Sequence, residues 1–306
     1  MPELIAVLVS DIHLSHRPPI ARSVEPDWYA AMARPLQELE ELQETDNGCV
    51  PVICAGDVFD KWNSSPELIN FALDKLPEMY AIPGQHDLPY HGIEEIQKSA
   101  YWTMERAKKL YDLNLGEPVS LGSGRLVFWG FPYGSELKAC PSFFTDVVRL
   151  AVAHQYVWTT DKHYVGADPS GQVLTVRKKL KGYDVALFGD NHKGFLLKGK
   201  PTIFNAGTFM RRTSSERDYQ PMVGLLHEDG TVKTHFLDTS RDRFLDDSVA
   251  AGAEQMMLHL EGFLEGLRGL GEAGLDFEKA VESALVEYGA SKAVRRVVLE
   301  AMEKEK

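Results

Sequence analysis

The sequence predicts an α/β fold in which β-sheets pack as a sandwich flanked by helices, followed by a small C-terminal helical module. Three observations lead to this prediction. Short apolar runs end repeatedly in polar or glycine-bearing clusters, helical patterns lie between the first of these runs, and the composition changes abruptly near the end of the chain. Alternation of strands and helices is typical of layered α/β domains.

The apolar runs predict buried strands that stop at turns. The first five are Leu4–Val9, Val50–Ala55, Met79–Ile82, Leu150–Ala153 and Asp184–Phe188. Four more strands are expected at Leu126–Phe131, Thr202–Asn205, Met222–His227 and Val232–Leu237. Glu228, Asp229 and Gly230 form a plausible hairpin turn between the last two strands.

Helical patterns are expected at Asp27–Glu44, Pro66–Lys75 and Ile93–Leu110. From about Ser248 the chain is rich in Ala, Leu, Glu and Met, with apolar residues at helical spacing. We therefore expect two domains, residues 1–240 and 248–306, which a length of 306 residues accommodates. No internal repeat or low-complexity segment is evident.

The composition limits the class of protein. A net charge of −12 weighs mildly against a protein that coats nucleic acid by bulk electrostatics. Local basic clusters nevertheless occur at 177–181, at 193–200 and at Arg211-Arg212, and such clusters are more often solvated surface than contacts. Three irregularly spaced cysteines favour a reducing compartment, and no apolar run is long enough to span a bilayer. We expect a cytoplasmic protein without membrane contact.

The ends of the predicted strands carry the chemical signal. They supply Asp11-Ile12-His13, Gly56-Asp57-Val58-Phe59-Asp60, Gly84-Gln85-His86-Asp87, His154 and Gly189-Asp190-Asn191-His192. Ligands of α/β sheets bind where strands end and loops begin, so five strand ends can direct polar side chains at one point. Carboxylates, imidazoles and an amide carbonyl suit a pair of divalent transition metals. Such a pair, roughly 3.5–4 Å apart, can clamp a phosphate and activate water.

In this order the strand-end residues resemble the calcineurin-like metallophosphoesterase superfamily, whose pattern is D-x-H, G-D-x-x-D, G-N-H-D/E, H and G-H-x-H. The resemblance implies that a first metal ion is bound by Asp11, His13, Asp57 and His192. A second ion would share Asp57 as a bridge and add Gln85, His154 and Asp190. The expected ions are Mn²⁺, with Mg²⁺ or Fe²⁺ as alternatives.

The same resemblance gives three neighbouring residues roles without metal ligation. His86 would sit beside the scissile phosphate, as a proton donor to the leaving oxygen or as a stabiliser of charge. Asp87 would orient His86, and Asp60 would fix a ligating histidine. Two positions depart from the pattern, because Gln85 replaces Asn and Asp190 replaces the first His of G-H-x-H. Both changes fall on the second metal, so we expect that site to be altered.

At a finer level the spacing from Asp11 through Asp57 to His86 resembles the SbcD-type nuclease subunit of double-strand-break repair complexes, cellular or phage. The segment Asn205-Ala206-Gly207-Thr208, followed by Arg211-Arg212 and Glu216, supports this likeness, which covers roughly residues 4–240. It implies a DNA exonuclease or endonuclease of repair or recombination, an SMC-like ATPase partner of the SbcC type, and a homodimer. The C-terminal module would be a reduced cap, a partner-binding helix pair, or a packing appendage.

Further residues near the motifs are candidates for substrate contact, although each is equally compatible with ordinary surface: His16, Arg17, Tyr90, His91, Lys193, Arg211 and Arg212. A groove lined by Arg177–Lys181 and Arg211-Arg212 would favour DNA, and a closed pocket would favour a small phosphoester. Two alternatives to a nuclease therefore remain. One is a phosphodiesterase or phosphatase for small molecules, and the other is a non-catalytic binding module of the same fold.

Overall fold

The computed structural model describes residues 2–113, 118–121, 124–141, 146–162 and 167–246. All of these residues except Asp246 belong to the first of two units into which the chain divides, Met1–Leu245. The helical module expected at 248–306 lies outside the described residues and stays a prediction.

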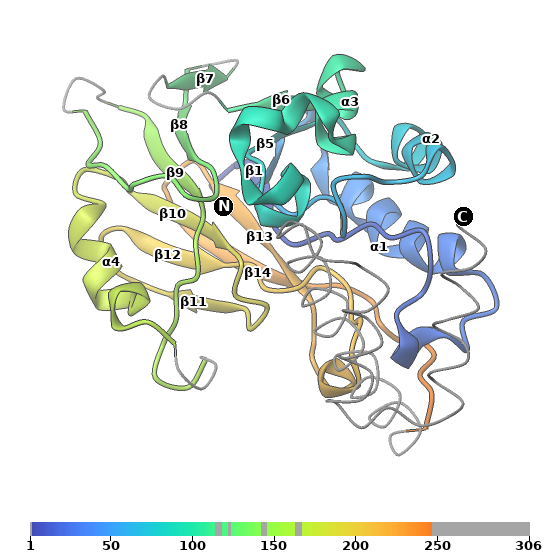
Figure 1. Ribbon diagram of the computed structural model, residues 1–306. Coiled ribbons are helices and arrows are strands. Elements are labelled where there is room, and N and C mark those ends of the chain that lie inside the picture. Colours follow the sequence, from blue (N-terminus) through green and yellow to red (C-terminus); the bar gives the residue numbers. More distant parts are fainter. Residues whose placement is uncertain (1, 114–117, 122–123, 142–145, 163–166, 247–306) are drawn as a thin grey trace, which may run out of the picture. The chain divides into compact units, whose positions relative to one another are not determined.

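The described residues form two six-stranded sheets and a short hairpin (Figure 1). The first sheet has the order β14 (Val232–Phe236), β13 (Met222–His227), β1 (Leu4–Val9), β4 (Val52–Cys54), β5 (Met79–Ala81) and β6 (Leu110–Asp112). The second has the order β11 (Phe195–Leu197), β12 (Thr202–Asn205), β10 (Val185–Gly189), β9 (Val148–His154), β8 (Leu126–Phe131) and β7 (Val119–Leu121). The hairpin pairs β2 (Glu44–Thr45) with β3 (Gly48–Cys49).

Four adjacent strands in each sheet run parallel, and antiparallel strands lie at the edges. In the first sheet β1, β4, β5 and β6 are parallel, with β13 antiparallel to β1. In the second sheet β8, β9, β10 and β12 are parallel, with β7 and β11 antiparallel at the two edges. Parallel strands end on the same edge of a sheet, so this topology gathers the loops after β1, β4, β5, β9 and β10.

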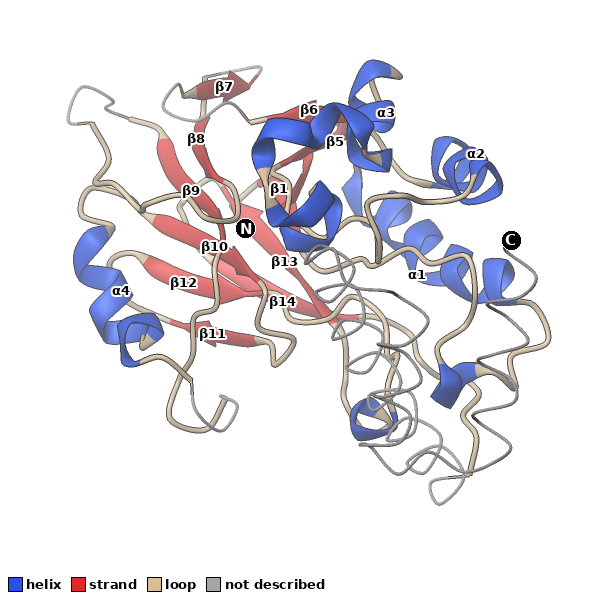
Figure 2. Ribbon diagram, viewed as in Figure 1, coloured by secondary structure: helices blue, strands red, loops and turns tan. Residues whose placement is uncertain are grey.

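Helices cover the outer faces of the sandwich, as Figure 2 shows. α1 (Trp28–Gln43), α2 (Pro66–Lys75) and α3 (Ala100–Arg106) share an apolar core with one face of the first sheet, and α4 (Val173–Lys179) with the outer face of the second. A third core fills the space between the sheets, where Leu8 and Ile53 of one meet Phe128 and Leu187 of the other. Strands covered on both faces read as continuous apolar runs, which is why LIAVLV in β1 showed no alternation.

The expected strands and helices agree with the structure within a few residues, with one exception. The helical pattern at Ile93–Leu110 divides into a 3₁₀ helix η4 (Ile93–Lys98), α3, and β6. Ser99 causes the first break, because its hydroxyl donates to the Ile96 carbonyl and accepts from the Trp102 N–H as the N-cap of α3.

Further short 3₁₀ helices lie in the connections: η1 (Ile20–Arg22), η2 (Gln85–Asp87), η3 (Pro89–His91), η5 (Pro169–Gly171) and η6 (Ser214–Glu216). The hairpin turn expected at 228–230 joins β13 to β14, with Gly230 at φ 77°. Among the described residues, no helix is both long enough and apolar enough to cross a membrane.

Candidate metal centre

The loops that follow β1 and β4 continue side by side beyond the sheet. The Asp11 N–H donates to the Gly56 carbonyl over 3.0 Å, and the His13 N–H donates to the Asp57 carbonyl over 2.9 Å. These backbone bonds fix the first two motifs relative to each other. Asp11, His13 and Asp57 are all fully buried, so their polar side chains must find partners inside the protein.

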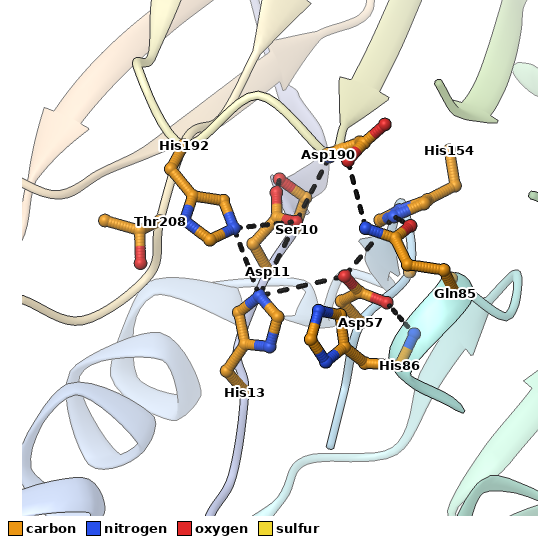
Figure 3. Close-up of polar contacts among 12 residues, drawn as sticks. Ser10, Asp11, His13, Asp57, Gln85, His86, His154, Asp190, His192 and Thr208 are labelled. Atoms are coloured by element: carbon orange, nitrogen blue, oxygen red, sulfur yellow. Dashed lines mark hydrogen bonds and ion pairs between the residues drawn. The ribbon is translucent and has the colours of Figure 1, made fainter. Parts of the chain in front are cut away.

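Backbone strain is concentrated at these motifs. Asp11, His13 and Asp57 have φ values of 51°, 49° and 54°, and Asp190 has 78°. Residues other than glycine rarely adopt positive φ, and such strain persists where the surrounding structure imposes it, often at functional sites. The strained backbone here turns acidic and imidazole side chains into one small volume (Figure 3).

Two glycines of the motifs permit this close packing. A Cβ atom on Gly84 would lie 2.1 Å from Asp57 Oδ1, and one on Gly56 would lie 2.4 Å from His154 Nδ1. Gly56 also has φ +93°, which side chains rarely tolerate. The glycines therefore let the loops after β4 and β5 approach the polar cluster.

The first group of potential ligands consists of Asp11, His13 and His192. His13 Nε2 and His192 Nε2 lie 3.2 Å apart, and Asp11 Oδ1 lies 4.0 Å and 3.9 Å from these two atoms. Two imidazole nitrogens that bind one tetrahedral ion at 2.0–2.1 Å are separated by about 3.3 Å. Burial, reinforced by the positive charge of Arg212, lowers the pKa of His13 well below its usual range. A neutral imidazole is the form that binds metal.

Asp57 occupies the position between the two halves of the centre. Its Oδ1 accepts from the His86 N–H over 2.9 Å, whereas its buried Oδ2 has no hydrogen-bond partner. Oδ2 lies 3.7 Å from His13 Nε2 and 3.4 Å from His154 Nε2. A buried carboxylate oxygen without a partner is costly, and a cation on each side would compensate for it.

His154 and Gln85 complete the second half. His154 Nδ1 lies 2.5 Å from the Ala55 carbonyl, so this nitrogen carries a proton and donates it. His154 Nε2 faces Gln85 Oε1 at 2.6 Å. Burial alone lowers the pKa of His154, but the Asp57 carboxylate and its acidic neighbours outweigh burial and raise it to about 10. The same negative charges favour a divalent cation at this position.

Three sets of side chains, with ligand atoms within 4.8 Å of one another, converge in the described residues: Asp11, His13 and His192; His13, Asp57 and His86; Asp11, Asp57 and His154. Asp190 is in none of these sets, and its carboxylate instead accepts from Gln85 Nε2 over 3.0 Å. The structure thus brings together the residues expected to bind metal, but it turns Asp190 toward Gln85. The donor set fits two divalent cations.

A loop after β12 places a carboxylate near Nδ1 of His192, the ring nitrogen that does not face His13. Glu216 Oε1 lies 3.8 Å from His192 Nδ1, and Glu216 Oε2 accepts from the N–H groups of Arg212 and Thr213. Burial lowers the pKa of His192, but Glu216 and Asp11 reverse this and raise it above the ordinary value. A carboxylate behind a metal-binding histidine fixes the orientation of its ring.

The hydrogen-bond partners of His86 and Asp87 differ from those expected from the sequence. Its Nδ1 donates to the Asp60 carbonyl over 2.8 Å, which leaves Nε2 as the nitrogen that can meet a substrate. Asp87 does not orient this ring. The buried Asp87 carboxylate accepts from the N–H groups of Val58, Phe59 and Gly84, and so it binds the loops after β4 and β5 together. Burial, with the negative charge of Asp57, raises the pKa of Asp87 to about 7.

Arg211 and Arg212 are adjacent in the sequence but have different partners, Asp242 for the first and Asp60 for the second. The Asp60 carboxylate forms an ion pair with Arg212 and lies 3.9 Å from His13 Nδ1, too far for a hydrogen bond. Arg212 is therefore held beside the centre. Arg211 is not available for substrate, because its guanidinium bonds Asp242, the Arg217 carbonyl and the Thr239 carbonyl and lies over the Phe244 ring. The expectation that Arg211 contacts substrate is wrong for this reason.

Of the remaining candidates, His16 and Arg17 are exposed, and His16 contacts Tyr29, Ser65 and Glu67. Lys193 is half-buried next to His192. These positions leave the predicted substrate contacts of His16, Arg17 and Lys193 untested.

Four aromatic side chains lie on the loops that follow β4, β5 and β8, at the carboxyl ends of the parallel strands. Tyr90 is 81% exposed, follows His86 by four residues, and lies with its ring 5.9 Å from that of Trp62. The His91 ring is 6.3 Å from Tyr133, whose ring is 6.4 Å from His154. We call Trp62, Tyr90, His91 and Tyr133 the aromatic rim. The sequence interpretation missed Trp62 and Tyr133, although Tyr133 follows the end of β8 at the same edge of the sheet as His154.

The basic cluster at 177–181 is remote from the centre. It lies at the end of α4 that leads into the start of β10, whereas Asp190 and His192 follow the end of β10. Arg177 donates to the carbonyls of Leu197 and Lys198, which places the Lys198–Lys200 turn at the same remote end. A groove lined jointly by Arg177–Lys181 and Arg211-Arg212, which would have favoured DNA as substrate, is therefore not formed by the described residues.

Comparison with known proteins gives a family match. The sequence pattern of a family described as calcineurin-like phosphoesterase matches residues 6–194, more than half of the chain. No curated protein sequence matches significantly.

Several solved structures resemble the chain at low identity. The sulfate thiohydrolase SoxB of Thermus thermophilus has 12% identity over 86% of this chain and 60% of that chain, with a TM-score of 0.45. A 5′-nucleotidase precursor, also of Thermus thermophilus, has 14% identity over 87% and 59%, with a TM-score of 0.46. The phosphoesterase YfkN of Bacillus subtilis has 12% identity over 84% and 96%, with a TM-score of 0.39. The chain spans about 60% of the length of the first two of these proteins.

Proposed function

This chain belongs to the calcineurin-like phosphoesterase family, and we propose that it hydrolyses phosphodiester bonds in DNA with two Mn²⁺ ions. Family membership makes it a metal-dependent phosphoester hydrolase. The choice of DNA as substrate, of Mn²⁺ as metal and of an SbcD-like role in repair or recombination is our proposal.

The centre supplies what phosphoester hydrolysis requires. Bound divalent ions polarise a phosphoryl oxygen and lower the pKa of water at the site. Asp11, His13 and His192 would hold one ion, and Asp57 would bridge to a second beside His154 and Gln85. His86 is fixed through Nδ1 by the Asp60 carbonyl, so Nε2 is the nitrogen that would meet the leaving oxygen. We assign to it protonation of that oxygen or stabilisation of its charge.

The aromatic rim is the observation that carries the choice of nucleic acid. Tyr90 and Tyr133 expose 81% and 39% of their surface beside a phosphoesterase centre. Aromatic rings can stack on unpaired bases, which contributes about 1–3 kcal/mol per base. A phosphodiester held at the metals would place its flanking bases near such rings, whereas a phosphomonoester without a base would not use them.

The charges around the centre are compatible with DNA as substrate, but the proposal does not depend on them. Arg212 is the basic side chain held next to the ligand histidines, through its ion pair with Asp60. Bulk basic charge is not the basis of DNA recognition, because the net charge is −12. The Lys198–Lys200 turn also lies at the end of the sheet that is remote from the metal centre. We expect recognition of DNA ends or unpaired segments rather than of long duplex.

The proposal is tested by incubating 5′-labelled single- and double-stranded oligonucleotides with the protein in Mn²⁺, beside a chromogenic phosphodiester. His86→Ala is the matched control. Oligonucleotide ladders that are lost in the mutant would support a metal-dependent nuclease. Intact DNA together with hydrolysis of the small ester would replace the proposal by a small-molecule phosphodiesterase. No hydrolysis and no metal uptake would revive a binding module of the same fold.

Partners are proposed on the resemblance to SbcD-type nucleases alone. They are an SMC-like ATPase of the SbcC type and a second copy of the chain. Light scattering of the purified full-length chain would test the homodimer, and ATP-dependent stimulation of DNA cleavage by a co-expressed SMC-like ATPase would test the heteromeric partner.

A further inference from the structure

The side chain of Gln85 links two residues of the second half of the centre. Its Oε1 lies 2.6 Å from His154 Nε2, and its Nε2 donates to Asp190 Oδ1 over 3.0 Å (Figure 3). The amide therefore spans from the buried imidazole to the carboxylate that follows β10.

The chemistry of the two partners determines which way the amide points. An ionised carboxylate can only accept hydrogen bonds, so the NH₂ group of Gln85 must face Asp190. The carbonyl oxygen then faces His154, whose Nδ1–H is already donated to the Ala55 carbonyl. His154 Nε2–H donates to Gln85 Oε1 over 2.6 Å. Where a metal ion replaces that proton, Gln85 Oε1 and His154 Nε2 would both offer a lone pair to it, next to the unpartnered Asp57 Oδ2.

Asp190 itself is held away from the converging ligands. Its backbone has φ 78°, and its N–H donates to Asp11 Oδ1 over 3.1 Å. This backbone bond belongs to the peptide group, so it persists whatever side chain stands at 190. The carboxylate turns toward Gln85 and is absent from the three sets of described residues whose ligand atoms converge.

We propose that Asp190 is a positioning residue, which orients the Gln85 amide so that its carbonyl oxygen binds the second metal ion. Gln85 and Asp190 act as a matched pair: the longer amide side chain reaches across the site, and the acceptor oxygen at position 190 holds its NH₂ group. The second ion then keeps Asp57, His154 and Gln85 as its protein ligands. Loss of an outer hydrogen bond of this kind typically lowers metal affinity by about 10- to 100-fold.

The test is calorimetric titration of Mn²⁺ into metal-free protein, with electron paramagnetic resonance to detect coupled Mn²⁺ pairs. Asp190→Asn keeps a carbonyl acceptor for the Gln85 NH₂ group but removes the carboxylate. Asp190→Ala removes the acceptor, and Asp190→Gly does so in a residue that adopts φ 78° without strain. The first ion, bound by Asp11, His13 and His192, is the internal reference for correct folding.

We expect Asp190→Asn to bind the second ion within about 3-fold of the wild type, and Asp190→Ala and Asp190→Gly to bind it about 10- to 100-fold more weakly. Equal weakening in Asp190→Asn would overturn the proposal, because it would make the carboxylate a direct ligand. Unchanged binding in the alanine and glycine variants would overturn it as well. These measurements use no DNA, so their outcome is independent of the proposed nuclease activity.

Discussion

The two ends of the sandwich differ in whether their polar groups have hydrogen-bond or ion-pair partners. At the carboxyl ends of the parallel strands, Asp57 Oδ2 is buried without a hydrogen-bond partner, and the Nε2 atoms of His13 and His192 lie 3.2 Å apart. At the amino ends, a cavity of about 450 Å³ is lined by residues that include Glu3 and Arg125, and Arg125 forms ion pairs with Glu3 at 2.6 Å and with Glu228 at 3.1 Å. The Arg125 guanidinium in the cavity thus has ion-pair partners, whereas the metal centre holds polar groups that a cation would satisfy.

The comparison shows that polar groups without partners mark the metal centre better than the number of nearby charges does. The Lys198–Lys200 turn also lies at the amino ends of the parallel strands, and its residues are exposed to solvent. Substitutions at the two ends should therefore have very different effects.

The largest effect is expected from Asp57→Ala. Removal of the proposed bridging carboxylate should abolish binding of at least one ion and lower kcat/KM on the order of 10³-fold or more, because metal polarisation contributes several kcal/mol to such reactions. Metal content by mass spectrometry and hydrolysis of a chromogenic phosphodiester measure the two effects. Full metal occupancy in this variant would contradict a bridging role.

His86→Ala should separate binding from chemistry at the same end. We expect both ions to remain and kcat to fall by about 10²- to 10⁴-fold, the usual contribution of a positioned proton donor. Near-normal turnover would show that the assigned role is wrong. His91→Ala, which removes an exposed imidazole from the same loop, is the matched control and should leave turnover of the small diester unchanged.

The metal-free protein should lose stability as the pH rises, because of His154. Burial acts against the charged ring, but Asp57 raises the pKa of His154 to about 10, above the ordinary value of 6.5. A raised pKa contributes stability that is fully present below pH 6.5 and is lost as the pH rises toward 10. Between about pH 6.5 and 9 the free energy of unfolding should fall by about 2–3 kcal/mol. Urea unfolding measures it.

The matched control for this pH effect is the same protein loaded with Mn²⁺, in which a cation replaces the proton. Its unfolding should vary less over the same pH interval. A metal-free protein that gains stability toward the alkaline end of that interval, relative to the loaded form, would refute the assignment.

A smaller effect is expected at the aromatic rim. Tyr90→Ala should raise KM for single-stranded DNA by about 10-fold, through loss of one base stack, and Tyr90→Phe should retain it. Hydrolysis of a chromogenic diester without bases should not change. If DNA is cleaved but both variants match the wild type, stacking at Tyr90 is excluded while the nuclease activity stands.

The smallest effect is expected at the opposite end. Replacing Lys178, Lys179 and Lys181 together by Glu should change kcat/KM for DNA by less than about 2-fold at physiological salt. β10 separates these residues from the centre by about 16 Å, which exceeds the Debye length of about 8 Å. A large, salt-dependent loss would show that DNA extends to this end.

Much of the fold could be predicted because its signals are local. The apolar runs of β1, β8, β12 and β13 end where the sequence indicates, since each strand is buried and stops at a polar or glycine turn. The division at Ser99 was missed, because a single hydroxyl interrupts an otherwise helical pattern. The helical module at 248–306 remains a prediction.

The candidate site was predictable in its members but not in their connections. Parallel strands bring their carboxyl ends together, so Asp11, Asp57 and His154 were expected to meet. Nothing local indicated that Asp87 would bind three backbone amides, or that Arg211 would be enclosed by Asp242 and Phe244. Apart from Gly84, which precedes Asp87 by three residues, those partners come from segments that are distant along the chain.

By itself the sequence determined the α/β class, the order along the chain of nine of the fourteen strands in the described residues, and the polar residues that follow the ends of several of them. Burial and turn preference act over a few neighbours, which is why these features could be predicted. Only the tertiary structure decided which of those residues face one another. In the structure the Asp190 carboxylate accepts from Gln85, and His86 donates to the Asp60 carbonyl. The Lys198–Lys200 turn lies at the end of the sheet that is remote from the metal centre. Hydrogen bonds and charges depend on direction and distance, which are fixed only when remote segments pack together.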